Sequence, residues 1–230
     1  MTKLKAWLLQ HKDCISSVVD FNPATDRLYP FDFTAQNQEL TDDILGDTSA
    51  FSAWAADKLE VSGSHYGIGG YNEHRTIYTR SSHFDTDEEP RRLHLGVDIW
   101  AKAGTPVYNF YDAEVHSFQY NDHFGDYGAT IILKYDLDGQ ILHVLYGHLS
   151  LASLDGLYEG KTIPGGKLFA YFGTPKENGH WPPHLHIQLI RDMEGKKGDY
   201  PGVCQFSKRT ACLENCPDPE LILRYTFQTP

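Results

Sequence analysis

The chain has 230 residues, of which 40% are hydrophobic and 22% are charged, and its formal net charge is -11 at pH 7. This length and composition are typical of a globular protein with a core of its own. The acidic balance argues against a nucleic-acid partner, because such partners are bound by basic surfaces.

The first residues, MTKLKAWLLQHKDC, contain only one short apolar piece, AWLL. A secretory leader needs roughly 7–15 apolar residues followed by a small-residue cleavage site, and no signal peptide is detected. No apolar run in the chain approaches the ~20 residues of a membrane span. We therefore expect a cytoplasmic protein, for which a role in the cell envelope would require non-standard export.

Residues 1–60 predict a short helical and irregular region that packs on the domain that follows. Thr41 and Asp42 are helix-capping residues, and Phe51, Trp54 and Leu59 recur at helical spacing. We expect one or two helices here. The glycine-rich segment that follows, SGSHYGIGGYNEHR, predicts a loop over or beside a cleft.

From about residue 61 the pattern changes to short apolar runs separated by turn residues, which predicts β structure. GATIILKY and QILHVLYGH predict a hairpin with a turn at Asp138 and Gly139. TPVYNF and EVHSFQY predict a second hairpin, KLFAYFG and HLHIQLI two further strands, and LILRYTF a closing strand. The expected fold is mainly β, a compact antiparallel two-sheet sandwich or barrel-like core over residues 61–195, with residues 196–230 as a C-terminal extension of the same domain.

Two smaller features receive structural interpretations. Glu73 and Arg75 are expected to form a structural ion pair. The four cysteines match no zinc-binding spacing and are expected to be free thiols in a reducing compartment, with a Cys212–Cys216 bridge as the alternative for an exported protein. They are Cys14, Cys204, Cys212 and Cys216.

The strongest chemical signal is a set of histidines in the predicted strands. In HLHIQLI, His184 and His186 share one face and the other face is apolar, so the histidines should line a cleft. In RRLHLGVDIW, His94 and Asp98 share a face, with open space expected above Gly96 between them. An imidazole, a carboxylate and a gap suit a small dication. Either histidine of HLH would complete a His₂Asp zinc site with an open fourth position.

A third segment, LYGHLS, places His148 at the rim of the same cleft, after a strand end. Three of these five side chains would bind metal, and two histidines would remain for proton transfer. The other histidines are interpreted as solvated or structural. They are His11, His65, His74, His83, His116, His123, His143 and His180.

These motifs resemble the lysostaphin/LytM-type zinc metallopeptidases, a family of peptidoglycan and glycyl-glycine endopeptidases. The family's HxxxD motif is similar to His94-Leu-Gly-Val-Asp98, its HxH motif to His184-Leu-His186, and its intervening segment to YGHLS with His148. The resemblance runs from about residue 91 to 188. It implies that His94, Asp98 and His186 bind one Zn²⁺ per chain, that His148 and His184 are the catalytic pair, and that residues 61–195 form the metallopeptidase domain.

The expected function is hydrolysis of peptidoglycan cross-links or of similar small-residue peptides that contain Gly or D-Ala. One alternative is a catalytically silent binding or activator module of the same fold. Another is a histidine phosphoryl carrier, which uses paired histidines but has no need for Asp98. A carbonic-anhydrase-like lyase is disfavoured by the Asp ligand. The sequence leaves the oligomeric state open.

Overall fold

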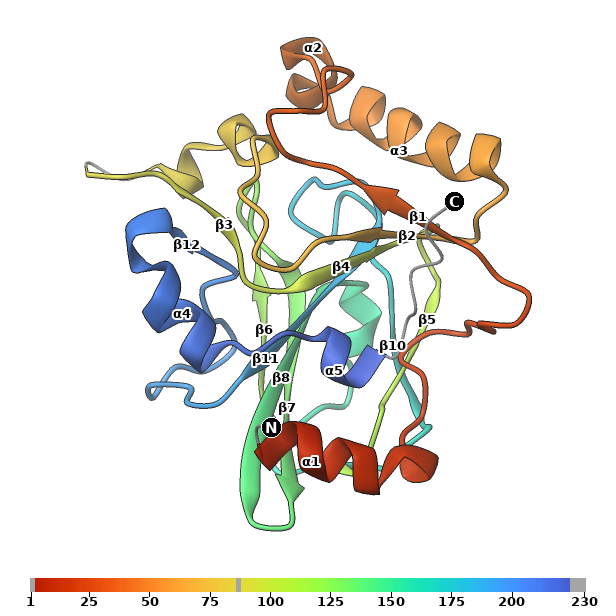
Figure 1. The fold of residues 1–230 in the computed structure, drawn as a ribbon, viewed down its shortest axis with the longest axis vertical. Helices are drawn as coiled ribbons and strands as arrows, with labels where there is room; N and C mark the ends of the chain where they lie inside the picture. Colours follow the sequence, from red (N-terminus) through yellow and green to blue (C-terminus); the bar gives the residue numbers. More distant parts are fainter. Residues whose placement is uncertain (1–2, 86–87, 224–230) are drawn as a thin grey trace.

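The fold is built on an eight-stranded sheet with the strand order β1-β2-β4-β11-β8-β7-β6-β9 (Figure 1). It is seen in a computed structural model that describes residues 3–85 and 88–223. The strands of this sheet are β1 (Leu28–Phe31), β2 (Tyr66–Gly69), β4 (Val97–Trp100), β6 (Ala113–Asn121), β7 (Gly128–Leu137), β8 (Gln140–Leu149), β9 (Thr162–Ile163) and β11 (His184–Ile190). β1 and β2 are parallel, and the other neighbours are antiparallel.

Two small sheets flank the large one. β5 (Pro106–Tyr108) pairs with β10 (Leu168–Tyr171), and β3 (Arg91–His94) pairs with β12 (Val203–Gln205). The predicted mainly β class is confirmed, and it takes the form of one large sheet with two small ones.

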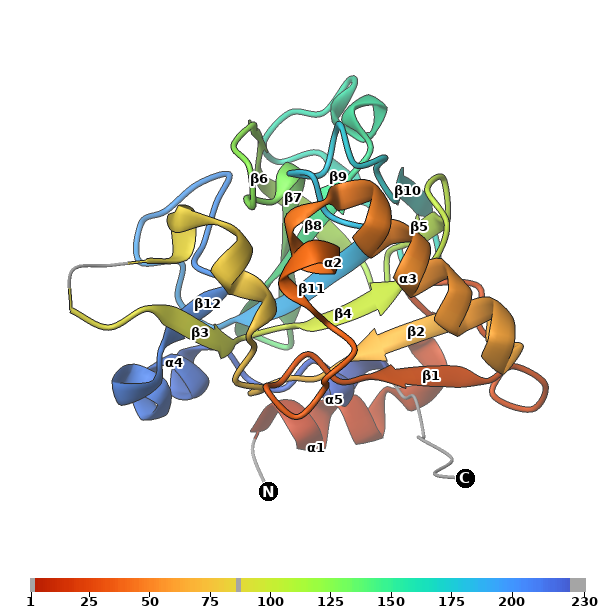
Figure 2. The same ribbon diagram turned by 90° about the horizontal axis from the view of Figure 1, so that it is seen from above.

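Helices are short and lie outside the large sheet (Figures 1 and 2). The α-helices are α1 (Lys3–Gln10), α2 (Asp42–Gly46), α3 (Thr48–Ser62), α4 (Arg209–Asn215) and α5 (Glu220–Leu223). The 3₁₀ helices are η1 (Lys12–Cys14), η2 (Ile77–Arg80), η3 (Ser82–Phe84), η4 (Leu151–Leu154) and η5 (Phe206–Lys208). No helix in the described ranges is long and apolar enough to cross a bilayer.

The helices expected from the capping residues and the apolar spacing are confirmed as α2 and α3. Residues 1–60 also contain α1 and strand β1, which were not predicted, and β1 joins the large sheet. The Thr41 hydroxyl accepts the N–H of Ile44 at the start of α2, and the Asp47 carboxylate accepts two N–H groups at the start of α3. α3 lies along β1 and β2 in both views (Figures 1 and 2). It packs through Phe51, whose ring lies 6.1 Å from that of Trp100 on β4. This contact joins the N-terminal helices to a strand that carries site residues.

The β7–β8 hairpin forms the centre of the core and is confirmed as predicted. Asp138 and Gly139 have φ angles of 54° and 82°, the left-handed pair that a tight hairpin turn requires. Apolar side chains of β7, β8 and β11 form the main buried cluster, together with Leu4 and Leu8 of α1. The division of the chain at residues 60 and 195 stays a prediction.

Two predicted strand arrangements are wrong. β5 does not form a hairpin with β6 but pairs with β10, because Asn109 and Phe110 are fully buried and direct the chain from one sheet to the other. The Asn109 side chain donates to the Ile163 carbonyl at 2.6 Å. Residues 221–223 are the end of α5 rather than a closing strand, since their apolar side chains pack into the main cluster as a helical turn. The remainder of LILRYTF lies outside the described residues.

The glycine-rich segment is also not a continuous loop, because its residues 66–69 are strand β2. A side chain at Gly67 would meet the Phe31 ring at 2.2 Å, and one at Gly69 would meet Arg75 at 2.8 Å. Glycine is therefore needed for β2 to lie between β1 and β4 with aromatic and guanidinium groups against it. Residues 70–76, which follow β2, form the predicted loop beside the site.

Candidate metal centre and active site

Adjacent strands of the large sheet bring the five predicted site residues together. In the antiparallel registers, His186 of β11 lies opposite Asp98 of β4 on one side and opposite Gly147 of β8 on the other. His148, the residue after Gly147 on β8, therefore lies close to His186. His184 lies two residues before His186 on β11. The alternation predicted for β11 is confirmed, since Leu185, Ile187 and Leu189 enter the main core. All five site residues are at least 94% buried.

Three donor atoms converge at the meeting point of these strands. His94 Nε2 lies 3.0 Å from His186 Nδ1, and Asp98 Oδ1 lies 2.9 Å from His186 Nδ1 and 3.3 Å from His94 Nε2. Donors that bind a tetrahedral zinc ion at their usual distances are separated by roughly 3.3 Å. This separation is close to those observed, so the three side chains fit the zinc site that the sequence predicted. Within the described residues this is the one group of three or more His, Cys, Asp or Glu that could hold a metal ion.

The outer nitrogen of each ligand-type imidazole is held by a hydrogen bond. His94 Nδ1 donates to the Gly70 carbonyl at 2.9 Å, and His186 Nε2 donates to Gln188 Oε1 at 3.0 Å. Each bond leaves the inner nitrogen with its lone pair directed at the site, as metal-binding histidines require. Burial and the cation of Arg75 lower the pKa of His94 to about 4, so its imidazole is neutral at pH 7.

Gly96 has a different role from the one predicted. A Cβ atom built on Gly96 would lie 2.5 Å from Cε1 and 2.7 Å from Nε2 of His186. The space above this glycine is therefore occupied by the His186 ring rather than open. Glycine is needed here because a larger residue would displace one of the three converging donors.

His148 and His184 form a second, adjoining pair. Their ring centroids are 4.1 Å apart, and His184 stacks on Trp100 at the same distance. His148 Nδ1 donates to the Asn178 carbonyl and His184 Nδ1 to the Pro182 carbonyl, at 2.8 and 2.7 Å. In both rings Nε2 is thus the nitrogen that can accept a proton. His148 is not at a rim, as predicted, but is 6% exposed with a left-handed φ of 62° near the end of β8.

Burial also determines the charge of this pair. It lowers the pKa of His184 to about 4, and burial together with the neighbouring His184 lowers the pKa of His148 well below its usual value. Both imidazoles are consequently neutral at pH 7. A neutral imidazole with a free Nε2 is a general base in the correct protonation state.

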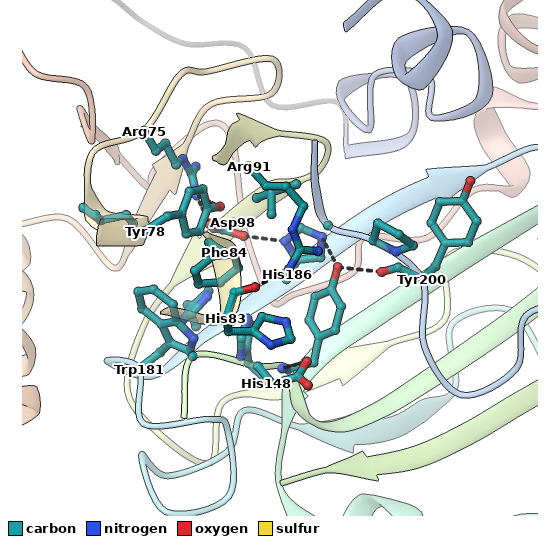
Figure 3. Close-up of a pocket in the computed structure, with 18 of the residues that line it drawn as sticks. Arg75, Tyr78, His83, Phe84, Arg91, Asp98, His148, Trp181, His186 and Tyr200 are labelled. Carbon is teal, nitrogen blue, oxygen red and sulfur yellow. Dashed lines mark hydrogen bonds and ion pairs between the residues drawn. The ribbon is translucent and has the colours of Figure 1, made fainter. Parts of the chain in front are cut away.

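Asp98 borders a cavity of about 130 Å³ together with three of the four site histidines, His148, His184 and His186 (Figure 3). Aromatic side chains of Tyr78, Phe84 and Trp181 form one wall, and residues 199–203 form part of another. His83, which the sequence assigned a structural or solvated role, also lines this cavity. The arrangement places ligand-type side chains and two bases in a small pocket with an aromatic wall.

Comparison with known proteins agrees with this geometry. Residues 92–199 match the family model described as Peptidase family M23. These residues belong to peptidase family M23. The M23 segment contains all five predicted site residues, and the resemblance seen in the sequence is confirmed at the level of the family.

Curated relatives and solved structures match parts of the chain. A DD-carboxypeptidase/endopeptidase, Mpg, of Neisseria meningitidis serogroup B is 32% identical over 126 residues, which cover 52% of this chain and 26% of the relative. Mpg of Neisseria gonorrhoeae is 31% identical with the same coverage. The match thus spans about a quarter of the length of these relatives. Among solved structures, the lysostaphin catalytic domain of Staphylococcus simulans has a TM-score of 0.42 at 19% identity, covering 70% of this chain and 96% of that domain. A zinc-containing peptidase of Vibrio cholerae has a TM-score of 0.34 at 23% identity, covering 43% and 27%.

The sequence did not reveal that Arg75 belongs to the candidate metal centre. This residue lies outside the M23 segment. The predicted ion pair with Glu73 is present at 2.7 Å, but Arg75 Nη1 also donates to Asp98 Oδ2 at 2.5 Å. Arg75 is 1% exposed. Although burial opposes ionisation of Asp98, the hydrogen bonds and positive charge around it hold its pKa well below the usual value. Because Oδ2 is occupied by the guanidinium, Asp98 presents Oδ1 to the two histidines.

A signal for Arg75 existed in the sequence but was ambiguous. The arginine follows a glycine-rich segment, and only the antiparallel pairing of β2 with β4 brings it beside Asp98. Sequence spacing alone gave no reason to join two residues 23 positions apart.

Proposed function

We propose that the chain is a zinc-dependent metallopeptidase that hydrolyses peptide bonds in peptidoglycan cross-links or in similar small-residue peptides containing Gly or D-Ala. The observation that carries this proposal is the convergence of His94, Asp98 and His186 beside a second pair of neutral histidines. Membership of peptidase family M23 supports a peptidase role, and the name of the Mpg relatives supports a peptide with D-amino acids.

His94, Asp98 and His186 would hold the zinc ion. When bound, zinc supplies a Lewis acid that polarises a scissile carbonyl and lowers the pKa of a water molecule. The protein contributes orientation through the bonds to Gly70 and Gln188, and it keeps Asp98 ionised through Arg75.

His148 and His184 would carry out the proton transfers. Each has Nδ1 bound to a backbone carbonyl and Nε2 free, so each can accept a proton from an attacking water molecule. The imidazolium that forms then has a donor at Nε2, which can stabilise a developing oxyanion or protonate the departing amine. Stacking of His184 on Trp100 limits rotation of that ring during the transfer.

The deciding experiment is digestion of defined muropeptides and glycine peptides by the full chain, with product masses recorded. Zinc-loaded protein should release products with a newly formed carboxylate and amine, and a chelator should abolish cleavage. Zinc-loaded protein that binds these peptides without cleaving them would instead identify a catalytically silent binding module. Transfer of phosphate to a histidine from a phosphohistidine donor would identify the phosphoryl carrier.

A further inference from the structure

A second arginine, Arg91, borders the same cavity as the site histidines (Figure 3). It is the first residue of β3, and its side chain extends into the pocket. Nη2 of Arg91 donates to the backbone carbonyl of His83, and its guanidinium lies 5.8 Å from the Phe84 ring centre. These contacts hold the position of the guanidinium, whose charge acts on the Asp199 carboxylate of the same cavity without a close ion pair among the described residues.

Arg91 differs in this respect from Arg75, the other cation of the pocket. Arg75 forms ion pairs with two carboxylates, whereas none of the described carboxylates lies within 4.0 Å of the Arg91 nitrogens. Arg91 Nε is buried and has no hydrogen-bond partner among the described residues. Buried N–H donors are normally paired, so the guanidinium that borders the cavity has donor capacity that a ligand in the cavity can use.

We propose that Arg91 binds a carboxylate of the substrate peptide and thereby selects peptides that carry a free carboxylate near the scissile bond. This inference rests on the proposed peptidase function. A guanidinium presents Nε and its terminal nitrogens as a planar fork that matches both oxygens of a carboxylate. A carboxylate therefore supplies two acceptor oxygens and a negative charge to the guanidinium, whereas a neutral amide can supply only one acceptor oxygen.

The surroundings of Arg91 strengthen this preference and orient the ligand. Phe84, Tyr78 and Trp181 provide apolar pocket walls, and ion pairs are stronger where water is excluded. Asp126 and Asp199 also line the cavity, and their charges disfavour a carboxylate placed next to them. The remaining cation, Arg75, is already occupied by Glu73 and Asp98. Arg91 is thus the cation available to a substrate carboxylate.

Such a carboxylate has two sources in a peptide: the free C-terminus of the residue released, or an acidic side chain. Four versions of one short peptide ending in D-Ala-D-Ala distinguish them. They carry a C-terminal acid or amide combined with a Glu or Gln side chain. If the C-terminal amide is cleaved less efficiently than the C-terminal acid, Arg91 binds the C-terminus. If the Gln peptide is cleaved less efficiently than the Glu peptide, Arg91 binds the side chain.

The matched variants are Arg91→Gln and Arg92→Gln. Arg92 is the next residue of β3, it does not line the cavity, and it pairs with Asp85 at 2.6 Å. With zinc-loaded protein, kcat/KM for the carboxylate peptide should exceed that for its amide by about tenfold or more, the size of effect expected for a charge-assisted pair. Arg91→Gln should remove this difference and retain zinc, Arg91→Lys should restore part of it, and Arg92→Gln should behave like the wild type.

A binding measurement separates this inference from the proposed function. Calorimetric titration uses the same peptides with the scissile amide reduced to CH₂–NH, which no peptidase cleaves. Arg91-dependent binding of the carboxylate form without cleavage of any natural peptide would contradict the proposed function and support the carboxylate site. Cleavage that is equal for acid and amide, or a preference that survives in Arg91→Gln, would overturn the carboxylate site. The carboxylate site would also be overturned if the wild-type protein bound none of the reduced peptides.

Discussion

Two histidine pairs on this fold have almost the same ring separation but very different surroundings. The His94 and His186 centroids are 4.9 Å apart, and those of His116 and His143 are 4.8 Å apart. The first pair shares a carboxylate, and each of its rings has its outer nitrogen bound to an acceptor. In the second pair His116 Nδ1 bonds with the Ser117 hydroxyl, and His143 Nδ1 has no partner within the described chain. Proximity of two imidazoles therefore does not by itself form a metal site.

Electrostatics separates the two pairs further. Asp98 contributes a carboxylate oxygen at 2.9 Å from His186, and it stays ionised because Arg75 is beside it. Lys197 and Lys134 are near His116, and their positive charge adds to burial in lowering its pKa. A dication is attracted to the first site by a fixed anion. The His116–His143 pair has lysines and carboxylates around it, and no third donor converges on it among the described residues.

The largest effect is expected when the carboxylate shared by His94 and His186 is removed. Asp98→Ala should abolish stoichiometric zinc binding and reduce peptide hydrolysis to background, because two neutral imidazoles remain without an anionic ligand. Metal content measured by elemental analysis checks the first result, and product masses check the second. The double variant His116→Ala/His143→Ala is the matched control and should retain both zinc and activity. Loss of zinc in that control would remove the distinction between the two pairs.

The next largest effect separates metal binding from proton transfer. His184→Ala should retain zinc, because His94, Asp98 and His186 are intact, but should lower kcat by about 10²–10⁴-fold, the usual contribution of a general base. Zinc content and initial rates, measured on the same preparation, test this prediction. Full activity of His184→Ala on a cleaved peptide would show that its assigned role is wrong.

A smaller effect concerns the buried cation of the metal-type site. Arg75→Gln leaves Glu73 and Asp98 without their counter-charge, so the metal-free protein should lose about 3–5 kcal/mol of unfolding free energy. Zinc should raise the melting temperature of this variant more than that of the wild type, because the dication replaces the missing positive charge. Arg92→Gln breaks a partly exposed pair with Asp85 and should cost under about 1 kcal/mol. Equal zinc stabilisation of wild type and Arg75→Gln would contradict this account.

The smallest effect concerns the His116–His143 pair and appears only at acidic pH. Burial lowers the pKa of His143 to about 4, whereas an unfolded histidine titrates near ~6.5. The unfolded state therefore binds the proton first, and stability falls as the pH decreases through this window. His143→Leu should reduce that fall by an amount on the order of 1 kcal/mol, measured by urea unfolding at pH 7 and pH 5. The matched control is the same substitution at an exposed histidine, His123→Leu.

Several features were determined by local sequence alone. Alternation in HLHIQLI places His184 and His186 on one face, since successive side chains of any strand point to opposite sides. The Asp138-Gly139 turn and the capping residue Thr41 identify a hairpin and a helix start through interactions within a few residues. The motifs of the M23 segment likewise identified the five residues that the fold brings together.

Tertiary structure decided which of these local pieces meet. β5 pairs with β10 rather than with its neighbour β6, and the space above Gly96 holds the His186 ring. Arg75 joins Asp98 only because β2 pairs with β4, and Arg91 shares the cavity with His186 only because β3 leads into β4 beside β11. Such contacts depend on strand pairing and side-chain volume across long sequence separations. Periodicity carries no information about either, so the bases and ligands could be read from the sequence whereas the arginines around them could not.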